Sequence, residues 1–100
     1  MKTIQLYEDG DSQQPIGYES YEASLVDKTN WSVKNDGSKF ATRFHNAIIR
    51  TSNTITLKIN STSNDGITIA STDGLEIHDM TINDLFITNT GTAAVKIFLY

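Results

Sequence analysis

The sequence has no cysteine and only one proline in 100 residues. Without cysteine, the fold cannot be held by disulfide bonds. A chain of this length buries roughly 60–65% of the surface that its unfolded form exposes, so small domains commonly rely on disulfides, metals or oligomerisation. Since no set of metal ligands stands out, the composition favours oligomerisation or docking on a larger body.

Positive charge and long apolar runs are also scarce. Eight Lys and Arg residues stand against twelve Asp and Glu residues, for a formal net charge of −4. The basic residues are scattered, whereas nucleic-acid binding needs them clustered. No stretch approaches the ~18 apolar residues of a membrane span, and residues 1–7 alternate instead of forming the apolar region of a signal peptide. We therefore expect neither a nucleic-acid nor a membrane partner.

Threonine, isoleucine, serine and asparagine are abundant, and β-branched residues suit a pleated, half-buried surface. Apolar and polar residues alternate in 54–60, 67–69 and 75–77, and the further strands expected at 85–87 and 95–99 are largely apolar. Turn residues separate these stretches, as in Asn64-Asp65-Gly66 and Asp73-Gly74. Strands that recur about every ten residues are typical of a sandwich or barrel. The sequence thus predicts one all-β domain over 1–100, an antiparallel β-sandwich or jelly-roll-like barrel with short turn-rich connections.

The first half of the chain is less regular. Ile4 and Leu6 suggest an opening strand, followed by an extended arm or loop near 8–20, so that 21–100 would form the sandwich core. Alternation resumes at 21–25 and again at Trp31 and Val33, ahead of a turn. The stretch Phe40 to Arg50 fits both helical spacing and strand alternation, and the surrounding pattern favours strand. If the chain holds a helix, 38–50 is where we expect it. The near-constant spacing of the later strands leaves a β-helix or fibre segment as an alternative.

Residues that could carry chemistry are few. His45 and His78 are the only histidines, and Glu76 would share a strand face with His78. A solvated polar face predicts the same spacing, so this pair does not indicate a catalytic site. The acidic cluster at 8–11 resembles a fragment of a calcium loop but does not continue its ligand series. None of the Asp-Gly pairs lies in a phosphate-binding loop. We therefore predict no catalytic, cofactor-binding or metal-binding residue, no cofactor and no enzyme activity.

Aromatic and apolar residues instead suggest contacts with a protein partner, because aromatic side chains anchor interfaces. In the last strand Val95, Ile97 and Leu99 face one way, while Phe98 and Tyr100 face the other. Such a strand is either central in the monomer or covered by another subunit. The candidate partner contacts are Tyr18, Tyr21, Trp31, Phe86, Phe98 and Tyr100.

The final third contains Leu75-Glu76-Ile77-His78-Asp79-Met80-Thr81-Ile82-Asn83-Asp84-Leu85-Phe86-Ile87-Thr88-Asn89, followed by Gly91 and Ala93-Ala94-Val95-Lys96-Ile97. In these residues it resembles small virion proteins of tailed bacteriophages. Those proteins commonly pair an "I-x-N-L-F-I-x-N" strand with an "N-x-G-x-A" turn that leads into a last strand.

The resemblance implies a β-sandwich decoration or cement protein that stabilises capsid subunits and is often trimeric. Its partner would be the major capsid protein or another virion protein, and its location the virion, assembled in the host cytoplasm. No catalytic residue is carried over. A tail, collar or fibre component is the alternative in the same class. From a different class, a carbohydrate-binding β-sandwich could use Trp31 and the tyrosines.

Overall fold

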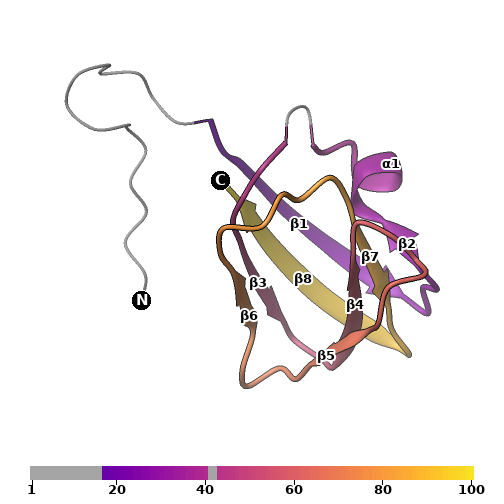
Figure 1. Ribbon diagram of the computed structural model, residues 1–100. Helices are drawn as coiled ribbons and strands as arrows, with labels where there is room; N and C mark the ends of the chain where they lie inside the picture. The colour runs from indigo at the N-terminus through magenta and orange to yellow at the C-terminus, as the bar shows by residue number, and fades with distance from the viewer. Residues whose placement is uncertain (1–16, 41–42) are drawn as a thin grey trace, which may run out of the picture.

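The computed structural model of the chain describes residues 17–40 and 43–100. They form two antiparallel four-stranded sheets that face each other (Figure 1). This confirms the predicted all-β fold and its β-sandwich architecture. The expected opening strand around Ile4 and Leu6 lies outside the described residues, as does most of the expected arm near 8–20.

The first sheet has the strand order β1-β8-β3-β6. It consists of β1 (Glu19–Val26), β8 (Thr92–Leu99), β3 (Ala47–Thr51) and β6 (Leu75–Ile77). Because β8 pairs with β1 on one side and β3 on the other, the last strand is central. Its inward face is therefore buried within the monomer.

The second sheet has the order β2-β7-β4-β5. It consists of β2 (Trp31–Ser32), β7 (Leu85–Thr88), β4 (Ile55–Ile59) and β5 (Ile67–Ile69). All strand pairings in the two sheets are antiparallel. The β-helix alternative is wrong for this part of the chain, because the coils of a β-helix stack as parallel strands.

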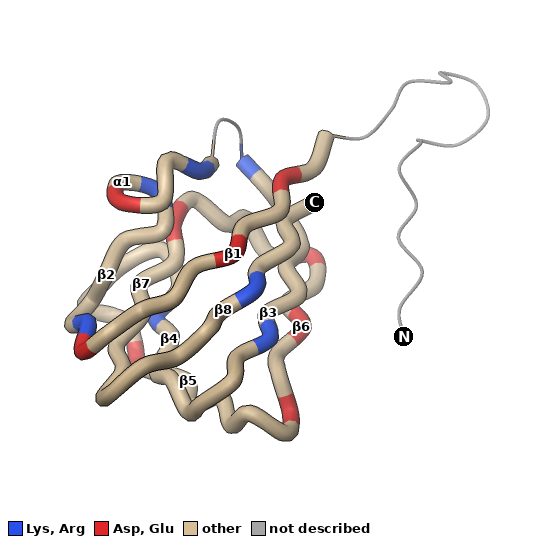
Figure 2. Tube along the Cα trace, turned by 180° about the vertical axis from the view of Figure 1, so that it is seen from behind, with Lys and Arg blue, Asp and Glu red and all other residues tan. Residues whose placement is uncertain are grey.

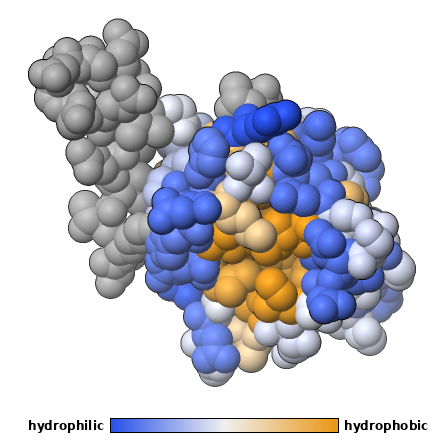
Figure 3. All heavy atoms as spheres, in the orientation of Figure 1, coloured by the Kyte–Doolittle hydropathy of each residue, from blue (hydrophilic) through white to orange (hydrophobic). Residues whose placement is uncertain are grey.

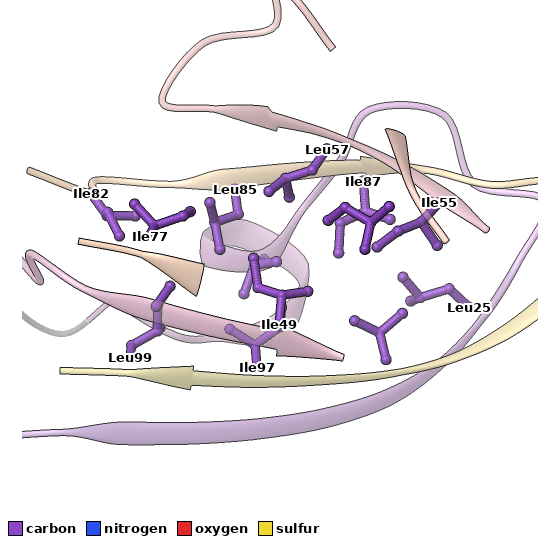
Figure 4. Packing of buried hydrophobic residues seen from close by; sticks show 14 of the residues in the cluster. Leu25, Ile49, Ile55, Leu57, Ile77, Ile82, Leu85, Ile87, Ile97 and Leu99 are labelled. Carbon is purple, nitrogen blue, oxygen red and sulfur yellow. The ribbon is translucent and has the colours of Figure 1, made fainter. Parts of the chain in front are cut away.

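The core lies between the sheets and follows from the two-residue period of the strands, which sends alternate side chains to opposite faces. In β8, the inward residues Ala93, Val95, Ile97 and Leu99 are buried while Thr92, Ala94 and Lys96 are exposed. Figure 4 shows the facing side chains of the two layers: Leu57, Leu85 and Ile87 point toward Ile49, Ile97 and Leu99. One continuous cluster joins both sheets.

The one helix of the described ranges, α1 (Val33–Gly37), lies where the sequence predicted a strand and a turn. Ser32 caps it by accepting a hydrogen bond from Asn35 N at 3.0 Å, and Ser38 ends it in the left-handed region with φ 56°. The segment 38–50 was the wrong place to expect a helix. There the strand β3 begins at Ala47, and Phe44 makes an isolated bridge to Ile82. No helix of the described ranges is long and apolar enough to cross a membrane.

The turns agree with the predicted positions but differ in detail. Gly74 and Gly91 adopt the positive φ angles, 67° and 75°, that glycine tolerates. In the connection from β4 to β5, however, Asn60 takes the positive φ of 68°, rather than the predicted Asn64-Asp65-Gly66. Asparagine is one of the residues that visit this region most easily.

Candidate protein-contact surface

The structure separates the six predicted contact residues into three groups. Tyr18, Phe98 and Tyr100 form an aromatic cluster, Tyr21 and Trp31 form a stacked pair, and Phe86 lies on the second sheet. The sequence could not predict this division, because it depends on which strands become neighbours.

The aromatic cluster lies on the outer face of the β1–β8–β3–β6 sheet. Phe98 points outward because its neighbours Ile97 and Leu99 point into the core. Tyr18 stacks on Phe98 with ring centroids 5.3 Å apart and an interplanar angle of 20°. The Tyr100 ring also lies beside Phe98, with its centroid 5.7 Å away and an interplanar angle of 50°. Since Tyr18 is 51% exposed, part of this apolar surface is open to solvent.

The cluster continues across the sheet. The register places Ser20 and Ile48 on either side of Phe98, and Glu76 beyond Ile48. Ile48 is half-buried and Ser20 is exposed. The result is a cross-strand row that spans all four strands of the sheet, apolar at its centre and polar at its ends.

A charged row lies next to the apolar one. Glu22, Lys96 and Arg50 occupy neighbouring positions on β1, β8 and β3 (Figure 2). Lys96 Nζ lies 3.5 Å from Glu22 Oε1, and Arg50 Nη1 donates a hydrogen bond to the Asp73 carbonyl at 2.9 Å. Exposed ion pairs of this kind contribute little to stability. Together with Ile48 and Phe98 these side chains line a hollow of about 260 Å³.

The outer face therefore combines aromatic anchors with charges of both signs. Protein interfaces are enriched in aromatic residues and arginine, with polar groups at the rim. A surface of this composition suits the recognition of another protein.

The stacked pair lies at the opposite edge of the sandwich from β6. The centroids of Tyr21 and Trp31 are 5.9 Å apart at an angle of 23°, and both rings pack against the core. Lys39 Nζ lies 5.8 Å from the centroid of the Tyr21 ring. Burial, and secondarily the negative charge of Asp36, raise the pKa of Tyr21. Because the two rings stack on each other and on the core, they do not form an open platform.

Phe86 is half-buried on the outer side of the second sheet, where it pairs with Lys58 of β4 and Ser32 of β2. It belongs to a different sheet from the aromatic cluster. A single partner that contacts the outer face of the first sheet would not reach it.

The residues that the sequence analysis considered for a catalytic site, His45, Glu76 and His78, are exposed on the surface. His78 Nε2 lies 3.2 Å from Glu76 Oε1, and both side chains are exposed. Within 17–40 and 43–100, no three His, Asp or Glu side chains come together in a group that could hold a metal ion. The acidic cluster at 8–11 lies outside the described residues.

The sequence reasoning missed a set of buried polar residues. Ser32, Asp84 and Asn89 are 6–8% exposed and hydrogen-bond to segments far away in the chain. One feature of the sequence could have indicated two of them: Asp84 and Asn89 directly flank the apolar strand β7. It also missed a polar hollow of about 530 Å³, lined mainly by threonine and asparagine side chains between the start of β4 and the β7–β8 turn.

No protein-family model, curated protein or solved structure matches this chain. Its function must therefore be inferred from its residues and its surface.

Proposed function

We propose that this chain is a structural virion protein of a tailed bacteriophage, a capsid decoration protein that binds capsid subunits through the outer face of the β1–β8–β3–β6 sheet. The observation that carries the proposal is the aromatic cluster. Tyr18 stacks on Phe98, and Tyr100 lies against Phe98 in a tilted arrangement, on a sheet face that the monomer leaves partly open. Clustered aromatic side chains at the centre of a contact supply most of its binding energy.

Three further arguments support this proposal. The last third of the chain resembles small virion proteins. The core is small and has no disulfide, since cysteine is absent, so docking on a larger body would add stability. Capsids also present many identical sites, and a symmetric homo-oligomer, with a trimer favoured, would bind several of them at once. No catalytic step is involved.

The test begins with the genome that encodes the chain. We expect the gene to lie near the gene for a major capsid protein, and particles assembled from that capsid protein to co-sediment with the chain. A gene located among tail genes, with binding to tails only, would favour the tail or fibre alternative. A chain encoded away from virion genes that binds neither particle would overturn the proposal.

The contact face is tested by a matched pair of variants. Tyr18→Ala removes a half-exposed ring from the cluster, and Met80→Ala removes a similarly exposed side chain, 45%, beside Ile59 and Ile67 of the other sheet. We expect Tyr18→Ala to weaken binding to particles by at least about tenfold, as the loss of an interface hot spot does, and Met80→Ala to leave it unchanged. Equal binding by both variants would place the contact elsewhere.

The carbohydrate-binding alternative makes a different prediction. It would place binding at the stacked pair, so Trp31→Ala would abolish binding on a glycan array while Tyr18→Ala would not. That result, together with no binding to particles, would replace the proposed function.

A further inference from the structure

Among the described edge strands of three residues or more, β5 is the one that carries no charge. The sheet edges are β1 and β6 in one sheet and β2 and β5 in the other. Glutamates lie on β1 and β6, and β2 has only two residues. In contrast, β5 carries no charge, and the uncharged run extends from Gly66 to Thr72. Edge strands are usually kept from pairing with other chains by charges, proline, bulges or shortness.

Apolar side chains are exposed beside this edge. Ile67 is 38% exposed and Met80 is 45% exposed. With Ile59 they line a hollow of about 350 Å³. Figure 3 shows hydrophobic residues gathered on the side of the molecule where Figure 1 places β4, β5 and β6. In the part of the chain that the structure describes, β5 pairs only with β4.

We propose that β5 pairs antiparallel with β5 of a second copy, about a two-fold axis at Thr68. A two-fold contact of this kind uses the same surface patch on both copies. It joins the β2-β7-β4-β5 sheets of the two copies into one continuous sheet, the mode of recognition known as strand addition. In this register Thr68 lies opposite Thr68, and Ile67 lies opposite Ile69 of the second copy.

The side chains on both faces of the sheet are compatible with this register. On the outer face, Thr88, Thr56 and Thr68 form a row across β7, β4 and β5, which the second copy continues. Threonines that pair across strands are favourable neighbours. On the inner face, the exposed Ile67 meets Ile69 of the second copy and loses its contact with water.

The charges are compatible as well. Two copies of a chain with a net charge of −4 repel each other, so they approach most easily along an edge without charge. Asp65, the charge nearest to β5 on its N-terminal side, lies opposite Ser71 of the second copy in this register, so the two Asp65 side chains do not meet. The contact area is smaller than the roughly 800 Å² per partner of a stable complex. We therefore expect a weak, reversible dimer.

The test uses opposite charges at the symmetric position. Thr68 is exposed, so Thr68→Lys and Thr68→Glu leave the core intact, which circular dichroism would verify. Sedimentation velocity of the full chain, from roughly 10 µM to 1 mM, should show concentration-dependent association of the wild type. Each variant alone should stay monomeric, because like charges face each other across the axis. An equal mixture of the two should associate again.

The control is Thr29→Lys, an exposed position between β1 and β2 at the other edge of the sandwich, which should associate like the wild type. A mixture that associates no better than either variant alone would overturn the proposal. A wild type that stays monomeric over this concentration range would overturn it as well. If the amides of residues 66–70 then resist hydrogen exchange at every concentration, another part of this chain covers β5. The aromatic cluster takes no part in this contact, so neither result bears on the proposed capsid contact through that cluster. The same sedimentation data also test the proposed trimer, which would sediment faster than a dimer.

Discussion

Ser32 Oγ donates a hydrogen bond to Asp84 Oδ2 at 2.7 Å, joining two buried residues that lie 52 positions apart. The other carboxylate oxygen, Oδ1, accepts hydrogen bonds from Lys34 N at 3.1 Å and Leu85 N at 2.7 Å. Ser32 also caps α1. The pair therefore ties the helix to the start of β7, and buried polar groups of this kind are costly to leave unpaired.

We expect Asp84→Ala to lower the free energy of unfolding by about 2–3 kcal/mol, because it leaves the Lys34 and Leu85 amides and the Ser32 hydroxyl without their acceptor. Ser32→Ala should lower it by about 1–2 kcal/mol through loss of the helix cap. Urea denaturation measures both. Asp65→Ala, at an exposed aspartate, should change stability by less than about 0.5 kcal/mol. A similar small change in Asp84→Ala would contradict this role.

Asn89 connects the β7–β8 turn to the segment after β1. Its Oδ1 accepts a hydrogen bond from Lys28 N at 3.0 Å, and its Nδ2 donates to the Leu25 carbonyl at 2.9 Å. Asn89→Ala should cost about 2–3 kcal/mol of stability in urea denaturation, since these groups lose their partners. Asn89→Asp should be at least as damaging, because it replaces the Nδ2 donor with an oxygen facing a carbonyl. Stability within about 0.5 kcal/mol of the wild type for Asn89→Asp would show that the donor is unimportant.

Alanine substitutions at Gly74 and Gly91 distinguish backbone strain from a steric clash with neighbouring atoms. Both have positive φ angles, but a Cβ at Gly91 would meet nothing within 4 Å, while a Cβ at Gly74 would lie 2.9 Å from the Ile49 carbonyl oxygen and against Arg50. We expect Gly91→Ala to cost about 1–2 kcal/mol from backbone strain alone. Gly74→Ala should cost more, since β3 must also shift.

The thermal midpoints of the two variants would show this difference. Gly17→Ala, where the added Cβ would meet nothing within 4 Å, serves as the control and should be close to neutral. Equal losses for Gly74→Ala and Gly91→Ala would mean that the close approach to β3 has no energetic consequence.

Ionisation of Tyr21 lowers the free energy of unfolding at alkaline pH. Its folded-state pKa is raised above the ordinary value of 10.0, by burial first and by the charge of Asp36 second. The folded protein therefore holds the phenol proton more tightly than the unfolded chain. This contribution to stability is fully present below pH 10 and is lost as the pH rises from there through the folded pKa. Urea denaturation across this range should show a smaller alkaline loss in Tyr21→Phe than in the wild type.

The two causes of this pKa shift can be separated. In Asp36→Asn, the pKa of Tyr21 should fall only part of the way toward its ordinary value, because burial is the larger cause. Tyrosinate absorbance, taken as the difference between each protein and its Tyr21→Phe counterpart, follows this titration. Asp65→Asn is the control and should leave the titration unchanged. A return of the pKa to its ordinary value in Asp36→Asn would show that burial plays no part.

The aromatic residues show the limit of reading function from a pattern. The sequence singled out all six, and alternation alone indicated that Phe98 faces away from Val95 and Ile97. Their grouping depended on contacts distant in the chain. Tyr18 meets Phe98 because β1 pairs with β8, and Tyr21 meets Trp31 because β1 and β2 lie at the same edge of the two sheets.

The strands of the second half were determined by the sequence itself, because a two-residue period of apolar side chains is a local property that favours one backbone geometry. Only the tertiary structure decided the place of α1, whose cap depends on Asp84 far along the chain, and the central position of β8. The tertiary structure alone also decided that β5 lies at the edge of its sheet. Pairing between distant strands depends on how all the apolar faces are buried together, and no single segment contains that information.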